Sequence, residues 1–83
     1  MSQTYYVRTQ YDGRDYRSVE EIYYYDKDGE EQVDEFLTNL CMDITTCADQ
    51  GEDTWSFIKD QVVLRLKDKE ISFEEIVCHQ DAE

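Results

Sequence analysis

The first part of the chain alternates between two sets of side chains, which is the pattern of a pleated strand. Residues 3–11 are rich in tyrosine, valine and threonine, and this composition favours a strand. One face is expected to carry Tyr5, Val7, Thr9 and Tyr11, and the other Thr4, Tyr6, Arg8 and Gln10. Asp12-Gly13 then predicts a hairpin turn, because a type I′ turn requires positive φ.

Residues 15–26 are expected to return mostly as a second strand. The run Tyr23-Tyr24-Tyr25 is β-prone. Ser18 is followed three residues later by Glu21, which fits a capping box and leaves a helix start as the alternative.

Helical spacing of apolar residues predicts one long amphipathic helix over residues 29–49. Asp28 is a suitable N-cap, with Glu31 as its acidic partner at N3 and Gly51 as a stop. The apolar arc holds Val33, Phe36, Leu37, Leu40, Cys41, Ile44, Cys47 and Ala48. Met42 falls on the opposite, charged side, where a flexible side chain can anchor a contact.

After Gly51, residues 55–59 and 61–67 look like two short strands, because apolar positions alternate there. Ser72 and Glu75 form a second capping box, which predicts a short helix over 73–79, with a strand as the alternative. Together the elements predict one α+β domain over residues 1–83. It has a small antiparallel sheet of about four strands and one long helix packed on one face.

Charge narrows the range of functions. The 83 residues contain 8 Lys and Arg against 21 Asp and Glu, a net charge of −13. Such a chain is a poor match for nucleic acid or for anionic membranes, whose binding relies on basic residues.

No apolar run approaches the length that spans a bilayer, and the start of the chain does not read as a signal peptide. We therefore expect a soluble cytoplasmic protein with reduced thiols at Cys41, Cys47 and Cys78.

Enzymatic chemistry has little support in the sequence. The only histidine, His79, lies near the end of the chain, and there is no glycine-rich phosphate loop. The cysteines lack the spacing of a zinc knuckle. We expect no enzyme activity, no cofactor and no metal.

A calcium-responsive module is kept as an alternative. Asp26, Asp28, Gly29 and Glu35 match positions 3, 5, 6 and 12 of an EF-hand loop. Tyr24 then occupies the first position, where a ligand is required, so a capped turn fits this segment better.

The strongest functional signal is the placement of the acids. Residues 20–53 hold twelve acids against Lys27, a net charge of −11. Acids spaced along a helix can replace phosphates in a basic site and speed association. The candidate partner-binding residues are Glu20, Glu21, Asp26, Asp28, Glu31, Asp34, Glu35, Met42, Asp49, Glu52 and Asp53, with Tyr6 and Tyr24 from the strands.

The seven tyrosines are the second signal. One helix covers only one face of a sheet, so some tyrosines should remain exposed, and exposed tyrosines favour interfaces. A structural or regulatory homodimer that pairs through a tyrosine-rich sheet face is therefore a further alternative.

In its size, its helix-on-sheet pattern and its acid cluster from Glu20 to Asp53, the chain resembles small acidic phage-encoded inhibitors such as anti-CRISPR and DNA-mimic proteins. The resemblance implies a non-enzymatic inhibitor that acts in the host cytoplasm. Its partner would be a basic nucleic-acid-binding host protein, such as a CRISPR effector or another defence protein. Its carboxylates would stand in for phosphates.

Overall fold

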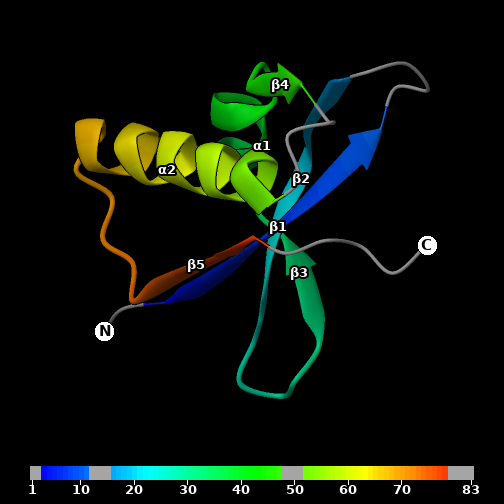
Figure 1. Cartoon of the computed structure of the whole chain (residues 1–83). Helices are drawn as coiled ribbons and strands as arrows, with labels where there is room; N and C mark the ends of the chain where they lie inside the picture. Colours follow the sequence, from blue (N-terminus) through cyan, green and yellow to red (C-terminus); the bar gives the residue numbers. More distant parts are fainter. Residues whose placement is uncertain (1–2, 12–15, 48–51, 79–83) are drawn as a thin grey trace.

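The described part of the chain forms an α+β fold, as predicted (Figure 1). The structure is a computed structural model that describes residues 3–11, 16–47 and 52–78, without the side chains of residues 47, 52 and 53. The predicted Asp12-Gly13 turn and the predicted stop at Gly51 lie outside these ranges. The elements are β1 (Thr4–Tyr11), β2 (Tyr16–Tyr25), β3 (Glu31–Val33), α1 (Glu35–Cys41), β4 (Thr45–Cys47), α2 (Glu52–Asp68) and β5 (Glu75–Cys78).

The sheet is mixed, which corrects the expectation of a purely antiparallel one. Its order is β3-β2-β1-β5, and β4 also pairs with β2. The pairs β1–β2, β2–β3 and β2–β4 are antiparallel, whereas β5 runs parallel to β1. A parallel neighbour requires a crossover connection. Between β1 and β5 the chain crosses the sheet through α1 and α2, so β5 returns in the direction of β1.

The first two predicted strands are confirmed. β1 buries Val7 and Thr9, which belong to the face predicted for them. β2 extends through Tyr25, and Ser18 lies in the ladder opposite Gln10 instead of capping a helix. The β-prone tyrosine run therefore outweighs the capping-box signal.

The long helix predicted over 29–49 is wrong, because this segment forms β3, α1 and β4. The N-cap of the seven-residue α1 is Asp34 instead of Asp28, and Gly29 has a φ of +83° in the turn before β3. Only part of the predicted apolar arc is buried in the core. Leu37 and Cys41 are buried, whereas Phe36 is 61% exposed.

The two strands predicted over 55–59 and 61–67 are also wrong, because α2 occupies both. Thr54, Ile58, Val62 and Leu66 are all nearly inaccessible to solvent, and their four-residue spacing is that of one helix face. Leu64 lies on another side of α2 and is 59% exposed, so its alternation with Val62 and Leu66 does not reflect a strand.

The short helix predicted over 73–79 is wrong, and its alternative is confirmed over β5. Ile76 is buried and pairs with Tyr5 of β1. The backbone N–H of Glu74 donates to the Gln3 carbonyl oxygen at 2.9 Å. The backbone hydrogen bonds that this segment makes with β1 therefore outweigh the capping-box pattern of Ser72 and Glu75.

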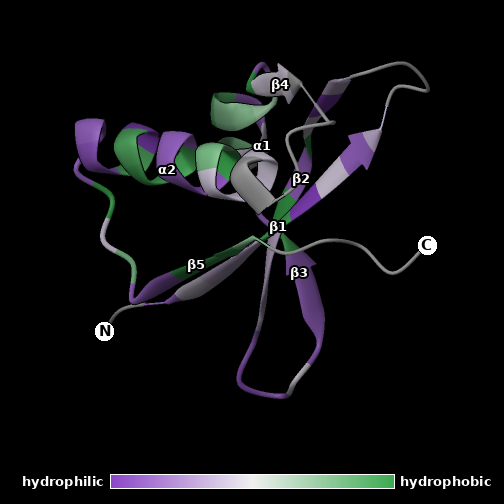
Figure 2. Cartoon of the chain, in the orientation of Figure 1, coloured by the Kyte–Doolittle hydropathy of each residue, from purple (hydrophilic) through white to green (hydrophobic). Residues whose placement is uncertain are grey.

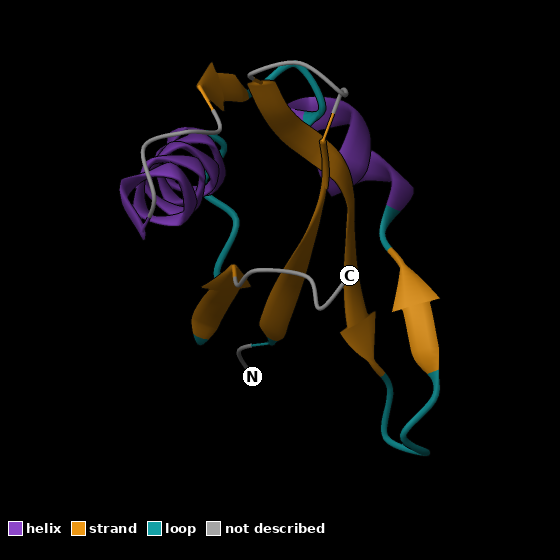
Figure 3. Ribbon diagram, turned by 45° about the vertical axis from the view of Figure 1, so that its right-hand side comes forward, coloured by secondary structure: helices purple, strands orange, loops and turns teal. Residues whose placement is uncertain are grey.

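Both helices pack on the same face of the sheet and leave the other face without a helix (Figure 3). The core between the layers draws on β1, β2 and β5 from below and on α1, α2 and the segment before β4 from above (Figure 2). Its buried side chains are Val7, Val19, Ile22, Leu37, Cys41, Ile44, Ile58, Val62, Leu66 and Ile76. Each large aliphatic side chain contributes about 1.5–3 kcal/mol when fully buried. No helix among the described residues is long and apolar enough to cross a membrane.

Candidate interaction surface

A row of paired side chains from four strands lines the side of the sheet that faces away from the helices. Tyr23 of β2 lies between Val33 of β3 and Tyr6 of β1, and Tyr6 pairs in turn with Val77 of β5. Alternation along the strands places further side chains on the same side. We name this surface the tyrosine face, and it consists of the row together with Arg8, Glu21, Tyr25, Glu31 and Glu75.

Three tyrosine rings pack tightly at its centre. The rings of Tyr6 and Tyr23 are stacked with centroids 5.5 Å apart, and Tyr25 meets them edge-on at 5.3 and 5.8 Å. These arrangements suit the ring quadrupoles and contribute about 0.5–1.5 kcal/mol per pair beyond burial. Tyr23 is only 8% exposed, and burial raises its pKa. Tyr25 is 43% exposed and presents aromatic surface to solvent.

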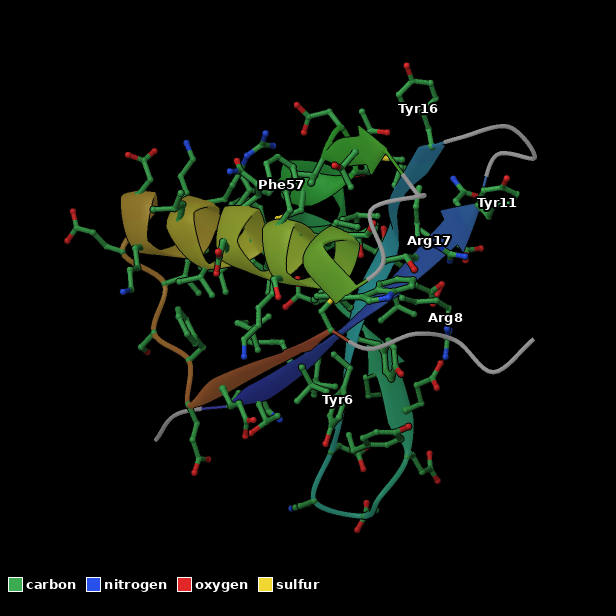
Figure 4. The ribbon with its side chains drawn as sticks, viewed as in Figure 1. Tyr6, Arg8, Tyr11, Tyr16, Arg17 and Phe57 are labelled. Carbon is green, nitrogen blue, oxygen red and sulfur yellow. The ribbon has the colours of Figure 1, made fainter. Side chains whose placement is uncertain are left out.

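Arg8 extends this cluster with a positive charge. Its guanidinium carbon lies 4.4 Å from the centre of the Tyr23 ring. It also donates to Glu21 at 3.0 Å and to Glu31 at 3.3 Å, and the hydrogen bond to Glu31 raises the pKa of Arg8. Figure 4 shows Tyr6 and Arg8 on the side of the sheet away from Phe57, which projects from α2.

The acids are concentrated in one segment beside the tyrosine face. Residues 26–35, which we name the acidic segment, hold six carboxylates against Lys27, a net charge of −5. The segment comprises the turn after β2, strand β3 and the first residue of α1. The predicted concentration of acids is therefore carried by a β-hairpin instead of a helix face.

Asp26 fixes the shape of this hairpin. One carboxylate oxygen accepts from the backbone N–H groups of Asp28 and Glu30 at 2.9 Å, and the other accepts from Gln32 at 3.0 Å. The backbone N–H of Asp26 donates to the Glu30 carbonyl oxygen at 2.9 Å. These bonds, led by that from Glu30, lower the pKa of Asp26. Asp26 therefore organises the turn.

Three other predicted partner-binding acids also have structural roles. Glu21 and Glu31 bind Arg8, and Asp34 accepts from the Leu37 backbone N–H at 3.0 Å as the cap of α1. Glu20, Asp28 and Glu35 are exposed, as is Glu31. Glu30, which was not among the predicted site residues, is exposed as well.

The two predicted tyrosines lie on opposite faces of the sheet, so they do not form one surface. Tyr6 belongs to the tyrosine face, whereas Tyr24 packs edge-on against Tyr5 at 6.0 Å on the helix side. Burial, with a smaller effect of the Asp34 charge, raises the pKa of Tyr5. Successive residues of a strand point to opposite sides, which already separates Tyr24 from Tyr23 and Tyr25.

The remaining predicted residues are scattered. Met42 is the C-cap of α1 and is 52% exposed. Glu52 and Asp53 begin α2, and Asp49 lies outside the described residues. The structure therefore gathers the hairpin acids but places Met42 on the helix layer.

The described residues offer few reactive groups. Cys41 is a buried free thiol, and burial raises its pKa to about 11, whereas Cys78 is half-buried. No group of three or more potential metal-ligating side chains occurs within residues 3–11, 16–47 and 52–78. Asp26, Asp28 and Glu35 therefore belong to no such group in the described part of the chain, and the geometry gives the calcium alternative no support.

A shallow groove of about 150 Å³ lies between α2 and the segment that joins α1 to β4. Arg65 of α2 closes one side by donating to the Leu40 carbonyl oxygen at 2.8 Å and to the Asp43 carboxylate. The pKa of Asp43 is lowered by its hydrogen bond from Arg65. The Arg65 guanidinium therefore links α2 to the end of α1.

Sequence reasoning missed Arg8, Tyr23 and Tyr25 as members of one surface. The ladder brings Tyr6 opposite Tyr23 and Arg8 opposite Glu21, but a β-bulge between Arg8 and Thr9 shifts the register there by one residue. Counting back from the link between the strands would therefore place Tyr6 opposite Ile22, and no local signal of the sequence places these side chains on one surface.

No protein-family model, curated protein or solved structure matches this chain.

Proposed function

We propose that the chain is a non-enzymatic inhibitor that binds a basic nucleic-acid-binding protein and blocks its nucleic-acid site. The observation that carries the proposal is the net charge of −5 on the ten residues of the acidic segment. The hydrogen bonds of Asp26 hold its turn in a defined shape. Carboxylates in fixed positions can meet a surface that is built to receive phosphates.

The exposed acids of the segment supply the charge in this proposal. Asp28, Glu30 and Glu35 are exposed. The other three acids of the segment, Asp26, Glu31 and Asp34, are hydrogen-bonded and maintain the fold. A surface of this kind accelerates encounter with a basic partner, and the acceleration weakens as salt screens it. The resemblance to anti-CRISPR and DNA-mimic proteins favours a host defence protein as the partner.

The experiment reverses two charges on the hairpin. Asp28→Lys with Glu30→Lys changes the charge by +4 without removing a side chain that has a described structural role. The matched control is Asp60→Lys with Asp68→Lys, which makes the same charge change on exposed positions of α2. Partners captured from a host lysate, and purified CRISPR effector complexes, are tested by surface plasmon resonance with and without competing duplex DNA or RNA.

The hairpin variant should associate about tenfold or more slowly, because steering by charge acts on the association rate. The α2 control should change association much less, and nucleic acid should displace the unmodified protein. If the hairpin variant binds as well as the α2 control, or if nucleic acid and this protein bind the partner together, the mimicry proposal is wrong.

A homodimer is the second candidate, and the exposed part of the tyrosine face favours it. Tyr25 and Val33 are 43% and 46% exposed, side by side with the buried Tyr23. Sedimentation at increasing protein concentration tests this candidate. A monomer at all concentrations rules it out.

A further inference from the structure

We infer that the tyrosine face is the part of the surface that recognises the partner, and that it selects an arginine-bearing segment over a lysine-bearing one. The inference rests on the proposed function and deepens it. The acidic segment supplies attraction to any cation, whereas the tyrosine face would supply the preference for guanidinium.

The chain itself shows how this face holds a guanidinium. Arg8 lies over the Tyr23 ring at 4.4 Å, and its N–H groups reach the carboxylates of Glu21 and Glu31. The flat face of the guanidinium stacks on the aromatic ring, and its N–H groups donate to the carboxylates.

A second such position lies one row further along the sheet. Tyr25 pairs directly with Glu31 across β2 and β3, and both residues are exposed. The rings of Tyr6 and Tyr23 pack against Tyr25 in edge-on contacts, with centroids 5.3 and 5.8 Å away. A partner guanidinium placed on Tyr25 would meet an aromatic ring and the Glu31 carboxylate, which it would share with Arg8.

Charge complementarity selects a basic occupant. The tyrosine face carries three carboxylates, on Glu21, Glu31 and Glu75, against the single guanidinium of Arg8, a net charge of −2. The acidic segment shares Glu31 and Val33 of β3 with this face and adds five further carboxylates, on Asp26, Asp28, Glu30, Asp34 and Glu35. A second copy of this chain would bring the same excess of negative charge to the contact, and like charges across an interface are unfavourable.

Arginine is favoured over lysine for a physical reason. A guanidinium is planar, less strongly hydrated than an ammonium, and able to stack on an aromatic ring while it donates to a carboxylate. An ammonium is a compact, strongly hydrated charge. Two peptides of equal charge therefore separate recognition by the rings from simple attraction.

The experiment uses nona-arginine and nona-lysine as probes and measures binding by fluorescence anisotropy at physiological salt. Tyr25→Leu removes the exposed ring from the face. Phe57→Leu is the matched control, because Phe57 is an exposed aromatic of nearly equal accessibility, 42% against 43%, on the helix side. The Asp28→Lys and Glu30→Lys double variant reports on attraction by charge alone.

We expect nona-arginine to bind several-fold more tightly than nona-lysine. Tyr25→Leu should abolish this preference, and Phe57→Leu should preserve it. In the unmodified protein, nona-arginine should shift the amide NMR signals of Tyr6, Tyr25 and Val33 more than nona-lysine does, which keeps the test valid if Tyr25→Leu fails to fold.

Three results would overturn the inference. If the two peptides bind equally well, and only the hairpin variant weakens their binding, the face does not select arginine. The proposal of an acidic inhibitor would then still stand. Failure of both peptides to bind would overturn both proposals. A concentration-dependent dimer that Tyr25→Leu dissociates, with no preference between peptides, would assign the face to a second copy of the chain.

Discussion

Thr38 of α1 and Ile22 of β2 are joined by a reciprocal pair of hydrogen bonds. The Ile22 backbone N–H donates to the Thr38 hydroxyl oxygen at 2.9 Å, and that hydroxyl donates to the Ile22 carbonyl oxygen at 3.4 Å. Along this side, β2 pairs with β4 at its beginning and with β3 at its end. Thr38 therefore acts as a side-chain substitute for a neighbouring strand in the gap between them.

Replacing Thr38 with valine keeps the shape of the side chain and removes both hydrogen bonds. The Ile22 N–H is then left beside the core without its partner, which costs about 1–3 kcal/mol. Urea unfolding should show this loss for Thr38→Val and a smaller one for Thr38→Ser. Equal midpoints for Thr38→Val and the unmodified chain would show that the pair does not stabilise β2.

Asp34→Ala should weaken the start of α1. The carboxylate accepts from the Leu37 N–H at 3.0 Å, and loss of such a cap costs about 1 kcal/mol. Thermal unfolding checks the effect, with Asp34→Asn as a control that keeps a capping oxygen. Charge reversal at Asp34 would likewise remove the cap, so it is unsuitable for a binding test, whereas the exposed Glu35 can be reversed without that loss.

Acidification should loosen the hairpin of the acidic segment. The folded-state pKa of Asp26 lies below its ordinary value, so its hydrogen bonds stabilise the fold above the unfolded pKa, near 3.9. This stability is lost as the pH falls through the folded pKa. An NMR titration should show a depressed pKa for Asp26 and, in the same low pH range, movement of the Glu30 amide signal. An Asp26 carboxyl that titrates at the ordinary value would contradict the described network.

Alkaline conditions should act on Cys41 in the opposite sense. Burial raises the pKa of the Cys41 thiol from 9.0 to about 11. The fold therefore favours the neutral thiol, and this contribution to stability is fully present at any pH below the pKa of the unfolded chain. This contribution is lost as the pH rises through the pKa of Cys41 in the folded state. Iodoacetamide at mildly alkaline pH should modify Cys41 far more slowly in the native than in the unfolded chain, as measured by peptide mass spectrometry. Stability should fall less between pH 9 and 11 for Cys41→Ala than for the unmodified chain. Rapid native alkylation of Cys41 would show that its site opens readily.

The sequence predicted the first hairpin well because local signals agree there. The alternation of residues 3–11 and the tyrosines of β2 both favour strands. The tyrosine face could not be derived in the same way, because a β-bulge between Arg8 and Thr9 shifts the register by one residue and so changes which side chains of β2 lie beside those of β1. Of the acids singled out between Glu20 and Asp53, those of residues 26–35 lie in one segment, but that segment is mainly a β-hairpin and not the predicted helix face.

The middle and the end of the chain were misread because the same spacing fits two structures. Leu37, Cys41 and Ile44 do face one core, yet they lie on a short helix and the loop after it. In α2 the decisive pattern is the spacing of Thr54, Ile58 and Val62, and a polar residue at its start obscures it. At β5, the strand depends on β1, which lies far away in sequence, so no local pattern could identify it.

The parallel pairing of Thr4 with Glu75 closes a loop of roughly 70 residues. The β1–β2 hairpin is local, so β5 completes a sheet that neighbouring segments have already begun. While β5 is absent, one side of β1 offers unpaired N–H and C=O groups, which can recruit a strand from another molecule. Pairing of Glu75–Cys78 with β1 satisfies these groups, and the four-residue β5 then becomes the outer strand of the sheet on this side.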